Sequence, residues 1–262
     1  MLNPRIIPCL LIQNNGLVKT IKFNNPKYVG DPLNAVKIFN DKEADELIVL
    51  DIDATKENRE PNYQLIANLA SECRMPLCYG GGINSLKQAL EIFSLGVEKI
   101  AISTAAINDI SIISKIASRV GSQSIVIVLD VKKKLFSDKY EVFYKNGTKA
   151  TGFDAIEFAI KLEKEGAGEI VINSIDLDGT MKGYDLNLLK LIRDAVNIPI
   201  TILGGASNLE DFGKVIKEFG IIGLAAGSLF VFKGRFNAVL INYPTPQEKI
   251  NLIDYNINKS FK

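Results

Sequence analysis

The sequence predicts one α/β domain folded as a closed (β/α)8 barrel. Eight short apolar runs rich in β-branched residues recur along the 262 residues, and helix-length segments separate them. The runs are apolar almost without interruption, which indicates strands buried on both faces and therefore a parallel sheet. Eight strand and helix units in a chain of this length fit a closed barrel. A doubly wound open sheet is the alternative.

The predicted strands are, in order, "RIIPCLLI", "ELIVLDID", "PLCYGG", "KIAIST", "SIVIVLDV", "EIVINSID", "PITILGG" and "IIGLAAGS". Two segments between them carry clear helix signals. In residues 31–44, Asp31 can cap the first turn and Pro32 fits the first helical position. In residues 84–96, the helix can open at Asn84 or Ser85 and close at Gly96. Strand and helix therefore alternate along the chain.

The chain contains an internal repeat with an offset of about 124 residues. "LDIDAT" corresponds to "IDLDGT", "PLCYGGG" to "PITILGG", and "KIAISTAA" to "IGLAAGS". A repeat of this kind predicts two half-barrels, about residues 1–120 and 121–250, within a single domain of residues 1–262. The repeat also sets Leu11, at the end of the first strand, opposite Asp130 at the end of the fifth. Residues 254–262 are expected to form a short solvated tail.

Composition excludes several kinds of chemistry. The net charge is +1, from 31 basic and 30 acidic residues, so nothing favours nucleic acid or a membrane surface as a partner. Three cysteines in no metal-binding pattern, with no apolar signal segment, indicate a reduced, cytoplasmic protein that needs no metal or other cofactor. Histidine is absent, which removes imidazole bases and the commonest zinc ligand. Acid–base chemistry must rely on Asp, Glu, Lys or Tyr.

Glycine and hydroxyl residues end four of the predicted strands. The loops after barrel strands form the active-site face, and backbone N–H groups there can hold a phosphate. The alternative is that the glycines only permit tight turns. Because matching positions occur in both halves, a ligand with a phosphate at each end is expected. The residues are Gly80–Gly82, Ser103, Thr104, Gly204–Ala206, Gly227 and Ser228.

Several charged residues are candidates at the same face. Asp130 leaves a buried strand and is a candidate catalytic acid or base. Asp51 and Asp176 either bind substrate or tie a loop to a backbone N–H group. Lys19, expected in the loop after the first strand, can close over an anionic ligand, although such lysines are usually only solvated.

Four charged residues stand at or next to the starts of predicted strands, at the opposite face. Two basic and two acidic side chains at one level can form a ring that closes the barrel floor. Taken alone, such a ring stabilises the bottom of the barrel. The residues are Arg5, Glu46, Lys99 and Glu169.

Over nearly its whole length, the sequence resembles the cyclase subunit of imidazole glycerol phosphate synthase. The stretches that carry the resemblance are "RIIPCL", "DELIVLDI", "GGGI", "GSQS", "GAGEI" and "SIDLDGTMKGYD", followed by "GGA" and "AAGS". In that family a glutaminase subunit docks on the barrel floor, and ammonia passes a charged gate and a central tunnel to a bisphosphate substrate. The resemblance therefore implies that Arg5, Glu46, Lys99 and Glu169 are ammonia-gate residues. It implies phosphate binding for Gly82, Thr104, Asp178, Gly179, Gly205 and Ser228, with Ser103 in place of the usual asparagine.

The resemblance breaks at the centre of the site. The family uses two aspartates as acid and base, and here Asp130 matches one while Leu11 replaces the other. Asn173 stands where a threonine is usual, and Leu203 where a serine is usual. Loss of a positioned acid–base group typically costs about 10²–10⁴-fold in rate. The sequence therefore predicts different chemistry at this site.

"GLVKTIKF" and "YVGDPLNAVKIFN" further resemble a branch of the family found in bacterial clusters for surface polysaccharides. Members of that branch are thought to work with a class I glutaminase subunit and a third amidotransferase protein, which converts an N-acetyl group of a nucleotide-linked sugar into an acetamidino group. Three interpretations follow. The chain is an ammonia-conducting subunit of such a complex, a histidine-pathway cyclase with a substitute acid, or a non-catalytic scaffold that activates its glutaminase.

Overall fold

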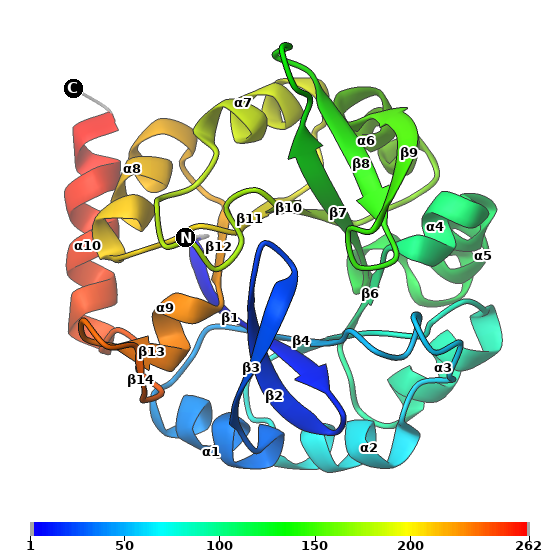
Figure 1. Cartoon of the computed structure of the whole chain (residues 1–262), viewed down its shortest axis with the longest axis horizontal. Helices are drawn as coiled ribbons and strands as arrows, with labels where there is room; N and C mark the ends of the chain where they lie inside the picture. The colour runs from blue at the N-terminus through cyan, green and yellow to red at the C-terminus, as the bar shows by residue number, and fades with distance from the viewer. Residues whose placement is uncertain (1–2, 261–262) are drawn as a thin grey trace.

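The computed structural model describes residues 3–260, and in these residues eight parallel strands close into a barrel (Figure 1). Neighbouring strands pair in the order β10, β11, β12, β1, β4, β5, β6 and β7, and β7 pairs with β10 to complete the ring. The (β/α)8 prediction is confirmed, and the open sheet is excluded. The barrel strands are β1 (Arg5–Gln13), β4 (Leu47–Asp51), β5 (Leu77–Gly80), β6 (Lys99–Ile102), β7 (Ile125–Lys133), β10 (Glu169–Ser174), β11 (Ile200–Leu203) and β12 (Gly223–Ala226).

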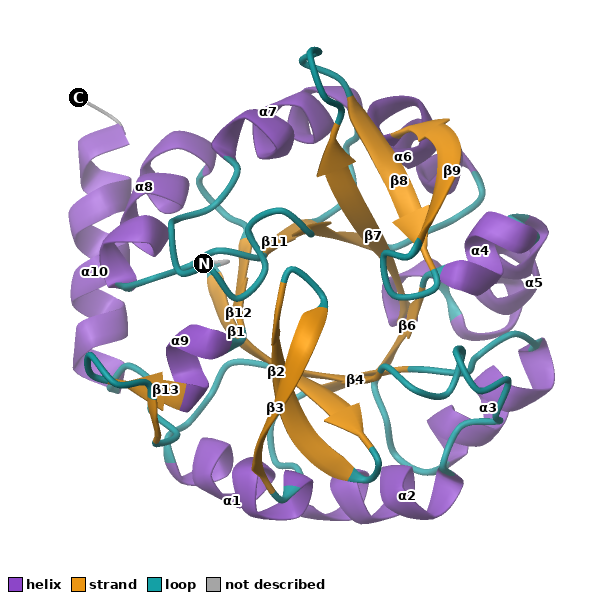
Figure 2. Ribbon diagram, in the orientation of Figure 1, coloured by secondary structure: helices purple, strands orange, loops and turns teal. Residues whose placement is uncertain are grey.

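Helices surround the ring of strands on its outside (Figure 2). The predicted start signals hold, because Asp31 accepts from the Asn34 N–H at 2.9 Å and Ser85, rather than Asn84, caps its helix. The helices are α1 (Pro32–Asp41), α2 (Tyr63–Glu72), α3 (Leu86–Ser94), α4 (Thr104–Asn108), α5 (Ser111–Val120), the 3₁₀ turn η1 (Ser122–Ser124), α6 (Ala155–Lys164), α7 (Leu186–Ala195), α8 (Leu209–Phe219), α9 (Ser228–Val231) and α10 (Pro246–Ser260).

The tail expected over residues 254–262 is helical as far as Ser260, because helix α10 continues to that residue and packs against α8. Asp254 and Tyr255 are exposed, as expected of a solvated segment. Within α10, Asn256 is buried, and a Cβ on Gly213 of α8 would lie 2.9 Å from the Asn256 amide nitrogen. Residues 261–262 lie outside the described part of the chain.

Two antiparallel extensions, which the sequence analysis did not predict, rise from the ends of β1 and β7. Strands β2 (Gly16–Ile21) and β3 (Asn24–Gly30) continue from β1, and β8 (Tyr140–Tyr144) and β9 (Lys149–Asp154) continue from β7. In Figure 1 both extensions stand in front of the barrel opening, which we call the mouth. A third, shorter ribbon follows α9 and consists of β13 (Phe232–Lys233) and β14 (Ala238–Val239).

The inside of the barrel holds an apolar cluster of its own, separate from the larger core between strands and helices. Residues at alternate positions of a strand share a face, so the inward positions of the eight strands meet in layers. The middle layers of the barrel form the cluster, and they lie between a charged floor and a polar mouth. The members are Ile7, Cys9, Ile48, Cys78, Ala101, Val126, Val128, Val171, Leu203 and Ala225.

The turn between α6 and β10 depends on one close backbone approach. A Cβ on Gly168 would lie 1.9 Å from the Ser122 carbonyl oxygen, and the Gly168 N–H donates to Ile125 at 3.0 Å. We therefore expect Gly168→Ala to lower the free energy of unfolding by about 3 kcal/mol, because the backbone must shift. Urea unfolding of both proteins measures the difference. Gly234→Ala is the control, because nothing lies within 4 Å of that Cβ and only about 1 kcal/mol from its positive φ is expected. If Gly168→Ala and Gly234→Ala lowered the free energy of unfolding equally, the close approach at Gly168 would not be the cause.

Candidate functional site

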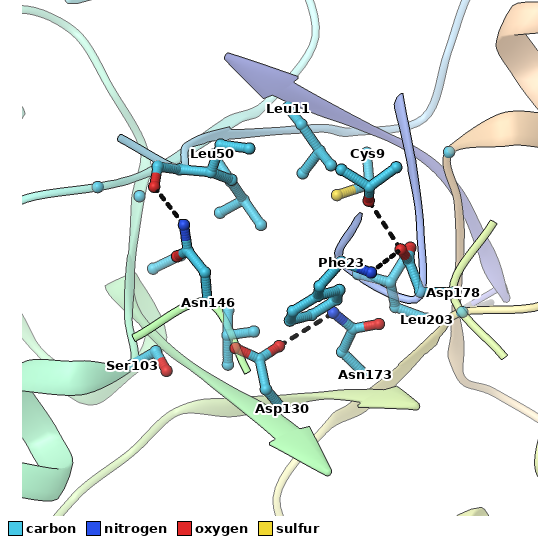
Figure 3. Close-up of a pocket in the computed structure, with 18 of the residues that line it drawn as sticks. Cys9, Leu11, Phe23, Leu50, Ser103, Asp130, Asn146, Asn173, Asp178 and Leu203 are labelled. Carbon is cyan, nitrogen blue, oxygen red and sulfur yellow. Dashed lines mark hydrogen bonds between the residues drawn. The ribbon is translucent and has the colours of Figure 1, made fainter. Parts of the chain in front are cut away.

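A pocket opens at the mouth, and all eight barrel strands or the loops after them contribute to its lining (Figure 3). Eighteen of the residues predicted at this face line it. Asp176 does not; its carboxylate accepts from the Lys133 N–H at 3.1 Å outside the pocket. The eighteen residues are Leu11, Lys19, Asp51, Gly80, Gly81, Gly82, Ser103, Thr104, Asp130, Asn173, Asp178, Gly179, Leu203, Gly204, Gly205, Ala206, Gly227 and Ser228.

The inward side chains at the top of the barrel divide the pocket into an apolar side and a polar side. Leu11 of β1 stands beside Leu50 of β4, its partner in the strand register. Asp130 of β7 stands beside Asn173 of β10 in the same way. Figure 3 shows the two leucines on the far side of the pocket from Asp130 and Asn173. Leu11 and Asp130 occupy matching places, each where an antiparallel extension begins to pair with its barrel strand.

Asp130 is the side chain best suited to proton transfer in the pocket. Burial raises the pKa of its carboxyl to about 7, although a hydrogen bond from the Asn173 amide, 3.0 Å away, opposes the rise. No ion pair to Asp130 exists among residues 3–260. A carboxyl group with a pKa near neutral can both take and return a proton. The pocket therefore holds one candidate acid–base group opposite an apolar wall.

Lys19 is buried in β2, which corrects the expectation of a solvated loop lysine. Its ammonium group donates to the Cys9 carbonyl oxygen. Burial lowers the pKa of Lys19, while Cys9 and Asp178 act in the opposite direction. A Cβ on Gly227 would lie 2.6 Å from the Lys19 nitrogen, so a larger residue at position 227 would displace the ammonium group. Lys19 thus places a cation next to the glycine and serine that begin α9.

The two predicted phosphate cradles lie on different sides of the pocket. One contains Gly82 with Ser103 and Thr104, where α4 begins, and the other contains Gly205 with Gly227 and Ser228, where α9 begins. The first N–H groups of a helix have no acceptor within that helix. The backbone at Gly205 has a φ of +107°, and a Cβ there would lie 2.1 Å from the Gly183 carbonyl oxygen. Both features require glycine at this position, whether or not a phosphate binds. The glycines therefore meet a packing need as well, and phosphate binding remains a prediction.

Asp178 is engaged by the first extension. Its carboxylate accepts from the Thr20 hydroxyl at 2.8 Å and the Phe23 N–H at 3.2 Å, and its N–H donates to Ser174. Burial raises the pKa of Asp178 against these hydrogen bonds. Asp51 ties its own loop in a similar way, through the N–H groups of Asp53 and Ala54. The loop-tying alternative therefore describes the contacts of Asp51 and Asp176 in this structure.

At the floor, the four predicted charges meet in one alternating ring. Arg5 contacts Glu46, and its other nitrogen lies 2.8 Å from Glu169. Lys99 lies 2.8 Å from Glu46 and 3.0 Å from Glu169. Both carboxylates are buried, and the Thr201 hydroxyl also donates to Glu169. Each cation therefore bridges both carboxylates.

The ring stays charged although burial works against it. Burial opposes the charge of Arg5 and of Lys99, but the two glutamates outweigh it and raise the pKa of each. In the same way Arg5 and Lys99 outweigh burial at Glu169 and lower the pKa of that carboxyl group. The ring and the polar side of the mouth lie at opposite ends of the apolar cluster inside the barrel.

Sequence reasoning missed three residues that line the pocket from the extensions, Thr20, Phe23 and Asn146. Figure 3 shows Phe23 and Asn146 in the pocket. The pair Asn146–Gly147, directly after the alternating run "YEVFY", is a hairpin-turn signal that could have revealed the second extension. The part of the chain that the structure describes contains no cluster of metal-ligating side chains, and none of its helices is long and apolar enough to cross a membrane.

Comparison with known proteins places the chain in a family. A family model described as histidine biosynthesis protein matches residues 5–237. A protein of Vibrio vulnificus (strain YJ016), provisionally named imidazole glycerol phosphate synthase subunit hisF3, is 56% identical over 95% of this chain and 96% of its own length. A provisionally named HisF subunit of Leptospira borgpetersenii is 58% identical over 95% of this chain and 98% of its own. The HisF subunit of Clostridium botulinum (strain Okra / Type B1) is 41% identical over 89% of this chain and 92% of its own length. This chain is therefore a HisF-like member of the histidine biosynthesis protein family.

Proposed function

We propose that this chain is the ammonia-conducting barrel subunit of a glutamine-dependent amidotransferase complex, and that the complex supports acetamidino-sugar formation for a surface polysaccharide. The observation that carries the proposal is the divided mouth. Asp130 is in place, but Leu11 and Leu203 stand where the family resemblance expects a carboxylate and a hydroxyl. A leucine can neither transfer a proton nor stabilise a charge, so the cyclase reaction loses half of its acid–base pair.

The floor supports the ammonia route. A ring of four charges at the base of a barrel gives a docked glutaminase a polar entrance. Above the ring, small side chains such as Cys9, Cys78, Ala101 and Ala225 fill the inside of the barrel. Neutral ammonia crosses such an apolar layer at far lower cost than an ammonium ion does. In this proposal Arg5, Glu46, Lys99 and Glu169 form the gate.

The proposed partners follow from the two ends of the barrel. A class I glutaminase subunit docks on the floor and releases ammonia there. A phosphorylated small molecule binds at the mouth, between the cradle at Ser103 and Thr104 and the cradle at Gly205 and Ser228. A third amidotransferase protein takes the ammonia to the sugar. Lys19 and Asp130 act on the bound ligand, as cation and as acid or base.

A second candidate function is the cyclase reaction of histidine biosynthesis. The match to the Clostridium botulinum HisF subunit favours it, because 41% identity over most of both chains accompanies an intact Asp130. In that case another group replaces the missing acid. The scaffold interpretation has no specific observation in its favour.

The first prediction separates these candidates by direct assay. With ammonium salt as the nitrogen source, we expect the purified chain to leave the aminoimidazole-carboxamide bisphosphate of the histidine pathway unconsumed. Leu11→Asp should restore trace turnover, because it returns a carboxylate opposite Asp130 at the matching place of β1. Leu11→Asn, which is polar but not acidic, is the control. Absorbance of the substrate measures its loss. Rapid consumption by the unmodified chain would establish the histidine function instead.

The second prediction concerns the buried carboxyl group. Because burial raises the pKa of Asp130 to about 7, the native state holds its proton where the unfolded chain has released it. Stability should therefore fall as pH rises from about 4 to about 7. Relative to Asp130→Asn, we expect a loss of about 2 kcal/mol, since solvent at the mouth screens part of the cost. Urea unfolding of both proteins at each pH measures it. If the free energy of unfolding of the two proteins changed with pH in the same way, the raised pKa of Asp130 would be contradicted.

The third prediction concerns the ring at the floor. Lys99→Met leaves Glu46 and Glu169 with Arg5 as their one cation in the ring, so we expect the free energy of unfolding to fall by about 3 kcal/mol. In the assembled complex, transfer of nitrogen from glutamine should fall, while transfer from added ammonium salt should be retained. Lys115→Met, which breaks an exposed pair with Asp109, is the control. Equal loss from both nitrogen sources would argue against a gate.

A further inference from the structure

The two extensions cross the mouth, and the tip of each is fastened to a loop of the other half-barrel. The tip of the first extension is the turn Lys22–Phe23, between β2 and β3. Lys22 donates its N–H to the Asp178 carbonyl oxygen at 2.9 Å, and Phe23 donates to the Asp178 carboxylate. Asp178 belongs to the second half. The first extension therefore ends over the loop that follows β10.

The second extension ends over the first half. Its tip is the loop 145–148 between β8 and β9. The Asn146 side-chain amide donates to the Ile52 carbonyl oxygen at 2.6 Å, and the Lys145 N–H donates to the Thr104 hydroxyl at 3.4 Å. Both acceptors belong to the first half-barrel. Figure 3 shows Phe23 and Asn146 reaching into the pocket, one from each tip.

The two tips correspond in the internal repeat. "IKFN" at 21–24 and "YKNG" at 144–147 align at an offset of 123 residues, the same offset that relates "PLCYGGG" to "PITILGG". In each tip a lysine precedes the residue that lines the pocket. Lys22 is thus the counterpart of Lys145, as Phe23 is of Asn146. A lysine at this place is a shared feature of both halves.

Turn preference does not account for these lysines. Lys22 and Lys145 have φ values of +51° and +50°, a region that Gly, Asn and Asp favour in hairpin turns. A residue with a long side chain held there costs free energy, and such costs gather at ligand clamps. Both lysines are exposed, and neither forms an ion pair within residues 3–260. By contrast, Lys133 and Lys134, at the end of β7 and just after it, pair with Asp138 and Glu141.

Each unpaired lysine stands next to an anion cradle of the opposite half. The Lys145 backbone contacts Thr104, a member of the first cradle. The Lys22 backbone contacts Asp178, which precedes Gly179, and Gly179 lines the same pocket as the second cradle. A lysine side chain is a flexible stem with a point charge at its end, which suits a phosphate group that enters from solvent. The geometry thus provides one exposed cation for each cradle.

We propose that Lys22 and Lys145 are ligand-binding residues that act across the two halves, each closing over the phosphate held by the cradle of the other half-barrel. The ligand class is a bisphosphate whose two phosphates lie on opposite sides of the mouth. The inference rests on the phosphorylated ligand of the proposed function. It adds that neither half-barrel completes its own phosphate site.

The test measures binding of two probes, inorganic phosphate and the aminoimidazole-carboxamide bisphosphate, by isothermal titration calorimetry. Lys22→Met and Lys145→Met should each weaken bisphosphate binding about threefold to tenfold, and the double variant by about the product. The dependence of the dissociation constant on salt should become shallower in each. Lys139→Met, which removes another exposed lysine of the second extension, should bind as the unmodified chain does. Thermal unfolding midpoints should stay unchanged in all four variants.

The outcomes separate this inference from the one it rests on. If the unmodified chain binds neither probe, the phosphorylated ligand and the role of both lysines are wrong together. If the unmodified chain binds the bisphosphate, and Lys22→Met and Lys145→Met bind it as tightly as Lys139→Met does, the phosphorylated ligand is supported. The two lysines then take no part in binding it. If only one lysine matters, the symmetrical arrangement across the halves is refuted.

Discussion

The closed ring of parallel strands is the constraint on which the rest of the structure depends. Closure forces every second residue of eight strands into one narrow interior, where each must suit its neighbours in the same layer. The floor holds charges of alternating sign, and the middle layers hold small apolar side chains. At the mouth, Leu11 and Leu50 stand on one side and the Asp130–Asn173 pair on the other, with Leu203 beside Asn173. The separation of charged floor, apolar middle layers and pocket at the mouth is therefore a consequence of strand register.

Register also explains why Leu11 belongs to a whole apolar side of the mouth. Leu11 pairs with Leu50, and both pack on the apolar cluster below them. A carboxylate at this place would stand beside leucine, without the amide that Asp130 receives from Asn173. Leu11 and Asp130 thus take matching positions at the ends of β1 and β7 and differ in their chemistry.

Much of the fold was predictable, because the barrel leaves a direct imprint on sequence. Buried parallel strands appear in the sequence as apolar runs, and Asp31 and Ser85 are the cap residues of their helices. The division into two half-barrels stays a prediction from the internal repeat. The extensions were missed because their strands are short and half exposed, so their apolar pattern is weak. Lys19 was misplaced for the same reason. Its burial depends on Cys9 and Gly227, which are distant contacts that no local pattern encodes.

The crossing of the extensions also bears on how the chain acquires its structure. The hydrogen bond from Phe23 to Asp178 joins residues that are 155 positions apart in the sequence, and the hydrogen bond from Asn146 to Ile52 joins residues that are 94 positions apart. Contacts of such separation form late, after the local elements that they connect. On the ribosome, the first extension emerges long before its anchor and has nothing to fasten to until the loop after β10 has been made. The mouth is thus the last part of the barrel to be assembled, although one of its walls is among the first segments to be synthesised.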